Sequence, residues 1–120
     1  MKRNLQLYLN DIYTNSKEIL IFIQGLSYEK FIDDKKTVYA VMRALEIIGE
    51  AAKQIPISFR KKYPEVEWKN MAGLRDVLIH EYFGINHAVI WQIIDNKLPS
   101  LIVQLEKIIE EYKLSQNSIF

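Results

Sequence analysis

Hydrophobic residues recur every three or four positions along most of the chain, a spacing that predicts amphipathic α-helices. The first such stripe covers residues 5–23 and is closed by Gly25. Ser27 can cap a short helical turn over residues 28–32. A second long stripe covers residues 35–54, and one of the two aspartates before it is placed to cap the helix. The first half of the chain is therefore predicted to be helical apart from short turns.

The second half of the chain is interrupted more often. Residues 56–67 hold two prolines and a run of three basic residues, and are expected to form a connector with one helical turn. The basic run, residues 60–62, is interpreted as a solvated face, with contact to a polyanion backbone as the alternative. A third helix is predicted over residues 68–82, and Asn86 can cap a fourth. A break is expected near residues 96–98, with Pro99 opening a fifth helix, because proline is not tolerated in a helix interior.

These segments predict an all-α fold, an antiparallel bundle of about four to five helices joined by short connections. The chain has 120 residues, which is the usual size of one domain. We expect a single helical domain over residues 1–114 and a frayed tail over residues 115–120.

Composition narrows the function classes. Lys and Arg number 16 against 15 Asp and Glu, a net charge of +1, which argues against binding of a polyanion through bulk charge. The chain has no cysteine, which excludes disulfides and thiolate chemistry, and only two histidines, His80 and His87, so a multi-histidine zinc site is not expected. The sequence has no long apolar run and no signal-peptide pattern, so we expect a soluble cytoplasmic protein. We also expect that it needs no metal or cofactor.

One stretch, residues 73–82, places Arg, Asp, His, Glu and Tyr within an otherwise apolar helix. Histidine exchanges protons near neutral pH, and arginine grips phosphate oxygens with a planar fork, so the set suits phosphodiester chemistry. A structural interpretation competes with this one. On spacing alone, Arg75 is more readily a salt-bridge partner of Glu46 or Glu50, and His80 a structural residue. We expect His87 to be exposed.

Helical geometry limits how the residues of this stretch can converge. At about 100° per residue, Arg75 and His80 lie about 140° apart around the axis, whereas Arg75 and Tyr82 share a stripe. Asp76 and His80 are four positions apart and can interact. One straight helix therefore cannot bring Arg75, His80 and Tyr82 together, unless Arg75 reaches around, the helix distorts or a second subunit completes the site.

The ordered motifs resemble those of HepT-like toxins in the HEPN superfamily. Arg75-x4-His80-x-Tyr82 resembles the Arg-x4-His-x-Tyr motif of that family. Residues 47–53 resemble its Ile-Gly-Glu-Ala segment, residues 68–75 its Trp-containing approach to the motif, and residues 89–101 the segment that follows. Leu74, Asp76 and Asn86 depart from the residues common in the family without removing a motif residue.

The resemblance implies a helical homodimer that acts as a metal-independent endoribonuclease toxin of a type VII-like toxin–antitoxin system. By this resemblance, Arg75 holds the scissile phosphate of the RNA substrate, and His80 serves as general acid or base for attack by the ribose 2′-hydroxyl. Glu50 and Asp76 are supporting residues that orient Arg75 or His80. A cognate minimal nucleotidyltransferase, the antitoxin, would silence the toxin by transferring AMP to Tyr82.

A second interpretation belongs to a different class of protein. The chain could be a non-catalytic helical subunit that docks a nucleotidyltransferase and helps it to bind nucleotide. The paired presence of Arg75 and His80 favours the nuclease, because a docking subunit has no need of them.

Overall fold

The computed structural model describes residues 4–80 and 86–117, without the side chains of residues 79 and 80. These residues form helices joined by short turns, with no strand among them. The helices are α1 (Leu5–Phe22), α2 (Tyr28–Asp33), α3 (Lys35–Lys53), α4 (Ile57–Arg60), α5 (Trp68–Ala72), α6 (Leu74–His80), α7 (His87–Asn96) and α8 (Leu98–Asn117). The predicted all-α fold is confirmed.

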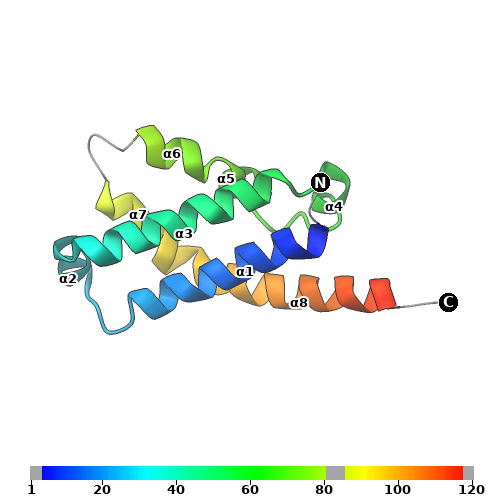
Figure 1. The fold of residues 1–120 in the computed structure, drawn as a ribbon, viewed down its shortest axis with the longest axis horizontal. Helices are drawn as coiled ribbons and strands as arrows, with labels where there is room; N and C mark the ends of the chain where they lie inside the picture. The colour runs from blue at the N-terminus through cyan, green and yellow to red at the C-terminus, as the bar shows by residue number, and fades with distance from the viewer. Residues whose placement is uncertain (1–3, 81–85, 118–120) are drawn as a thin grey trace.

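The long helices run antiparallel to their neighbours (Figure 1). α1 packs against both α3 and α8, while α5 and α6 lie on another side of α3. α7 leads into α8 and contacts it. The interior between α1, α3 and α8 is apolar, and its fully buried side chains include Leu9, Ile12, Ile19, Leu45, Ile48, Leu105 and Ile108.

Side-chain caps place the helix starts where the sequence predicted them. Ser27 accepts a hydrogen bond from the Lys30 amide at the start of α2, and Asn86 accepts one from the Val89 amide at the start of α7. Asp34, rather than Asp33, caps α3 by accepting from Thr37. The hydrogen bonds from the Thr37 hydroxyl and amide lower the pKa of Asp34. Such caps satisfy amide groups that have no partner within the helix.

Glycine and proline account for two of the boundaries. α1 ends before Gly25, whose φ of 79° lies in the left-handed region that favours glycine. α7 and α8 are separated at Lys97, as the sequence predicted, and Pro99 lies in the first turn of α8, where its missing amide costs no hydrogen bond.

Two boundaries differ from the prediction. The helix predicted over residues 68–82 is divided at Gly73 into α5 and α6, and its last part lies outside the described residues. α8 continues to Asn117, beyond the predicted start of a frayed tail at residue 115, with its last five side chains exposed. Good helix-forming residues carry α8 past its last buried position, Ile109.

Candidate functional site: the junction of α3 with α5 and α6

Gly49 allows the backbone of the motif segment to lie directly on α3. A Cβ atom at this position would be 3.2 Å from the Met71 carbonyl oxygen and 3.3 Å from the Arg75 amide nitrogen. It would also be 3.4 Å from the Leu74 Cβ. Because only a hydrogen occupies this space, α5 and α6 approach α3 more closely than a larger residue would permit. The contact spans Gly73, where the predicted single helix is divided.

The close approach at Gly49 sets Arg75 beside Glu50, the next residue of α3. Arg75 Nη1 donates a hydrogen bond to Glu50 Oε1 at 2.7 Å, and the two groups form an ion pair. The side chains are 51% and 47% exposed, so the pair contributes at most about 1 kcal/mol to stability. Its main effect is on geometry, because it fixes one edge of the guanidinium while half of the side chain still faces solvent.

The other predicted site residues are Asp76, His80 and Tyr82. Asp76 is exposed on α6 beside Arg75, while His80 is the last residue of α6 and its side chain is outside the description. Tyr82 lies outside the described residues. The structure thus brings Glu50 and Arg75 together, and the proximity of Asp76 to His80 stays a prediction from their four-residue spacing.

An apolar groove of about 450 Å³ borders the motif helix on the side of α7 and α8. Val77 of α6 and Val89 of α7 line it and are 41% and 36% exposed. Ile93 of α7 and Leu98 and Leu101 of α8 also line it. This groove was not predictable from the sequence, because a hydrophobic stripe does not reveal how far apart two neighbouring helices will lie.

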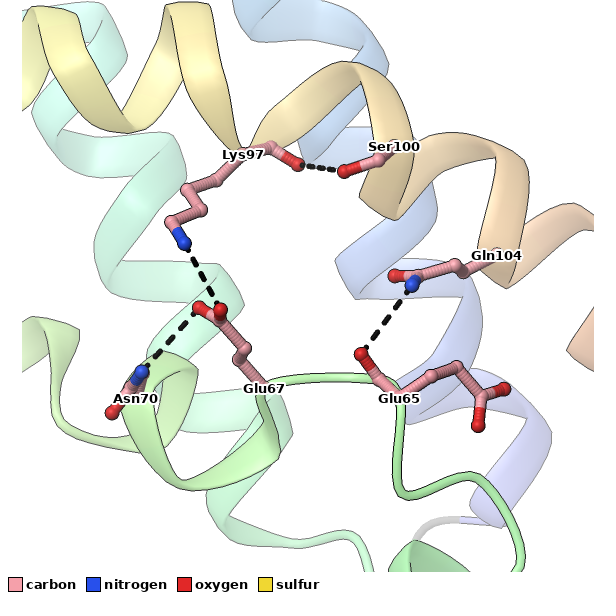
Figure 2. A network of polar contacts seen from close by, with 6 residues as sticks. All are labelled: Glu65, Glu67, Asn70, Lys97, Ser100 and Gln104. Atoms are coloured by element: carbon pink, nitrogen blue, oxygen red, sulfur yellow. Dashed lines mark hydrogen bonds and ion pairs between the residues drawn. The ribbon is translucent and has the colours of Figure 1, made fainter.

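A polar network joins the start of α5 to the junction of α7 with α8 (Figure 2). Lys97 Nζ lies 2.9 Å from Glu67 Oε1, and Asn70 donates to the other oxygen of the same carboxylate at 3.3 Å. The hydrogen bond from Lys97, which has the larger effect, and the hydrogen bond from Asn70 both lower the pKa of Glu67. Gln104 of α8 donates to the Glu65 carbonyl at 3.4 Å. The pair of Glu67 with Lys97 links the two sides of the apolar groove, which both residues line.

A second groove, of about 420 Å³, lies between α1 and α3. Glu50 lines it, so this groove adjoins the Arg75 pair. Arg43 and Tyr8 also line it. Arg43 Nη1 is 3.2 Å from Glu46 Oε2, in an exposed pair within α3. Arg43 has no motif in the sequence that would mark it as part of a site.

Other polar side chains have structural roles. His87, expected to be exposed, is half-buried, and its ring meets that of Phe31 edge to face with 6.5 Å between centroids. Phe31 itself is fully buried between helices, which draws His87 toward the core.

Arg60 also differs from expectation, since the basic run was interpreted as a solvated face. Its guanidinium donates to the carbonyls of Ala52 and Ile55 at 2.7 Å and 3.0 Å, at the end of α3. A cation at this position satisfies carbonyls left open at a helix C-terminus. Lys61 and Lys62 are exposed as expected.

Small and aromatic residues near the motif pack inside the chain. Ala51, Ala52 and Trp68 are buried, and the Trp68 indole donates to the Tyr63 carbonyl at 3.0 Å. Trp91 is half-buried against Phe31. These residues are therefore used within the chain, and exposed apolar area on the motif side is found at Val77 and Val89.

The sequence of this helical bundle matches a known family of proteins. The family model for "Ribonuclease HepT-like" matches residues 12–108, most of the chain. The chain belongs to the HepT-like ribonuclease family, as its motifs indicated.

Proteins similar to the chain over nearly their whole length bear ribonuclease names. One from Methanocaldococcus jannaschii, named "Putative RNase", is 48% identical over 98% of this chain and 98% of its own. The "Probable ribonuclease HepT" of Thermococcus cleftensis is 46% identical, over 90% of this chain and 98% of its own. A "Putative RNase" of Caldanaerobacter subterraneus is 42% identical, over 88% and 95%. No solved structure matches the chain significantly.

No helix within residues 4–80 and 86–117 is both long enough and apolar enough to cross a bilayer.

Proposed function

We propose that the chain is a metal-independent endoribonuclease and the toxin of a toxin–antitoxin pair. The observation that carries the proposal is the Glu50–Arg75 pair, which holds a half-exposed guanidinium on the motif helix of a HepT-like chain. A guanidinium fixed along one edge still offers N–H donors to a phosphate, which it binds through paired hydrogen bonds.

In the proposed reaction, Arg75 binds the scissile phosphate and neutralises charge as the transition state forms. One histidine nitrogen removes the proton of the ribose 2′-hydroxyl, whose oxygen attacks phosphorus. The bond from phosphorus to the 5′-oxygen breaks, and that oxygen takes the proton held by the histidine. The products are a 2′,3′-cyclic phosphate and a 5′-hydroxyl, and His80 is the residue proposed to carry the proton.

The active form in this proposal is a symmetric homodimer, the commonest oligomer among soluble proteins. The apolar groove beside α6 supports this assembly, because Val77 and Val89 expose apolar surface next to the motif helix. A second copy seated there would shield them and bring two motif helices to one cleft. Sedimentation should show a dimer at micromolar concentration, and Val77→Asp should shift it toward monomer.

The proposed antitoxin is a minimal nucleotidyltransferase that transfers AMP to the Tyr82 hydroxyl. An added phosphate anion would compete with RNA for Arg75 and repel the RNA backbone. Co-expression with the cognate nucleotidyltransferase should raise the mass of the intact wild-type protein by one or more adenylyl groups. The mass of Tyr82→Phe should not change. If Tyr82→Phe is silenced as well as wild type, the partner acts by binding alone.

The ribonuclease proposal is tested by incubating the purified protein with total RNA in EDTA. Wild type should produce fragments ending in 2′,3′-cyclic phosphate. His80→Ala should lose about 10²–10⁴-fold in rate, the usual contribution of a general acid or base. Arg75→Ala should lose hydrogen bonds worth roughly 1.5–3 kcal/mol each. Lys107→Ala, which removes an exposed cation from α8, is the matched control and should cleave like wild type.

Cleavage that requires added magnesium would contradict the metal-independent mechanism. If wild type leaves RNA intact under every condition but binds the nucleotidyltransferase, the chain is the non-catalytic docking subunit instead.

A further inference from the structure

The exposed face of α3 carries an aromatic and a cation in line with the Arg75 pair. Tyr39, Arg43 and Glu50 lie within about 40° of one another around the helix axis, at roughly 100° per residue. Arg43 lies about 10 Å along the axis from Glu50, and Tyr39 about 6 Å beyond it, at 1.5 Å per residue. We call these three residues the α3 stripe.

Tyr39 has no structural task that accounts for an aromatic residue at this position. Its side chain is 61% exposed, the largest exposure of an aromatic residue in the part of the chain that the structure describes. Within those residues, its ring is stacked on no other aromatic, and its hydroxyl makes no hydrogen bond. An exposed ring of this kind offers a flat apolar face to a ligand.

An anion can bind Arg43 with little loss of stability to the folded chain. Its side chain is 71% exposed, and its pair with Glu46 joins neighbouring turns of one helix in solvent. Exposed pairs of this kind contribute little to stability, so a phosphate can replace the Glu46 carboxylate. Arg43 and Glu50 also line the groove between α1 and α3, which makes the surface continuous from Arg43 to the Arg75 pair.

A cation that follows the backbone and an aromatic that stacks a base are the two elements with which proteins bind single-stranded nucleic acid. We propose that the α3 stripe is a substrate subsite that extends the RNA path from Arg75 along α3. Arg43 binds a phosphate neighbouring the scissile one, and Tyr39 stacks an unpaired base. The subsite selects single-stranded RNA, because a base within a duplex cannot present its face to Tyr39.

This inference rests on the proposed ribonuclease function and adds two residues that hold substrate without taking part in proton transfer. Binding groups that act equally on substrate and transition state change KM and leave kcat unchanged. Substitutions of Tyr39 or Arg43 should therefore raise KM alone, whereas His80→Ala lowers kcat.

The test measures binding of a short fluorescein-labelled single-stranded RNA to His80→Ala protein, so that the probe stays intact. Adding Tyr39→Ala should weaken binding roughly 5- to 100-fold, the range expected from base stacking on an aromatic ring. Adding Tyr39→Phe instead keeps the aromatic ring, and this protein should bind the probe as tightly as the His80→Ala parent. Adding Arg43→Ala should lower the slope of log Kd against log salt by about 0.7, the value for one phosphate contact to a single strand.

Lys107→Ala in the same background is the matched control for loss of one exposed cation. The subsite is overturned if Tyr39→Ala and Arg43→Ala bind the probe like this control while wild type cleaves RNA, an outcome that leaves the ribonuclease proposal intact. It is also overturned if Tyr39→Ala weakens the binding of a double-stranded probe as much as the binding of the single-stranded probe. If wild type neither cleaves nor binds RNA, the ribonuclease proposal fails as well.

Discussion

The bundle of α1, α3 and α8 and the segment from α5 to α7 are built on different principles. The bundle joins three long helices through side chains that are fully buried, such as Leu45 and Leu105. The segment from α5 to α7 is made of shorter helices, with an open apolar groove and a polar network between its walls. The first region holds the fold, and the second carries Arg75, whose side chain is half-exposed. The difference indicates that stability and proposed chemistry can be altered separately.

The largest effect on stability should come from the bundle. Leu45→Ala removes most of a fully buried side chain and should lower the free energy of unfolding by about 2–5 kcal/mol. Chemical denaturation measures the change. Val103→Ala removes two methyl groups from a side chain that is 66% exposed on α8, and should stay within about 0.5 kcal/mol of wild type. Equal losses in the two variants would mean that the core is not where the structure places it.

The two regions meet at Gly49, and alanine substitutions can separate packing from helix propensity. Gly49→Ala gains about 1 kcal/mol of helix propensity, but its methyl group meets backbone atoms of Met71 and Arg75, and overpacking costs about 1–3 kcal/mol. We expect a net destabilisation of up to about 2 kcal/mol. RNA cleavage should fall as well, because Arg75 is displaced from Glu50.

Gly73→Ala is the matched control for Gly49→Ala. A Cβ at Gly73 would lie 3.6 Å from its nearest neighbours, an ordinary contact, and the backbone φ of −83° suits alanine. This variant should be more stable by about 0.4–1 kcal/mol, since alanine restricts the unfolded chain. Thermal denaturation should show Gly49→Ala less stable than wild type and Gly73→Ala more stable. A stabilised Gly49→Ala would show that α6 is free to move away from α3.

The smallest effect should come from the polar network. Glu67 has its pKa lowered in the folded chain by Lys97 and Asn70, so it contributes stability when ionised. That contribution is complete above the ordinary glutamate pKa of about 4.3 and is lost as the pH falls through the lowered folded value. Glu67→Gln should slightly lower Tm at neutral pH, and its Tm should fall less than that of wild type on acidification. Parallel pH profiles for the two proteins would contradict this role.

Much of the fold was predictable because local signals and tertiary packing agree. Ser27, Asp34 and Asn86 cap helices, and the stripes of α1, α3 and α8 became the core. The division at Gly73 was not predicted, because a single glycine can also lie inside a continuous helix. Arg60 and His87 were misinterpreted for a different reason, since periodicity does not reveal the partners of their side chains, the carbonyls at the end of α3 and the ring of Phe31.

The candidate site was predictable in part. The sequence offered an ion pair of Arg75 with Glu46 or Glu50 as the structural alternative to a phosphate-binding role, and the structure shows the pair with Glu50. The groove beside α6 depends on the separation of neighbouring helices, which no periodicity encodes. Arg43 and Tyr39 were passed over because a charged or aromatic residue on a helix surface is unremarkable until its line with Arg75 is known.

The pairing of cations within the chain has a consequence for how fast RNA would be captured. Arg43, Arg75 and Lys97 each face a carboxylate, Arg60 caps the end of α3, and the whole chain carries a net charge of +1. Strong electrostatic steering, which can raise association rates by about 10–10³-fold, needs a surface dominated by one sign of charge. The chain lacks that dominance. Encounter with RNA should therefore be slow for a nuclease and nearly insensitive to ionic strength, and discrimination among RNAs should arise after collision, in how long each one stays bound.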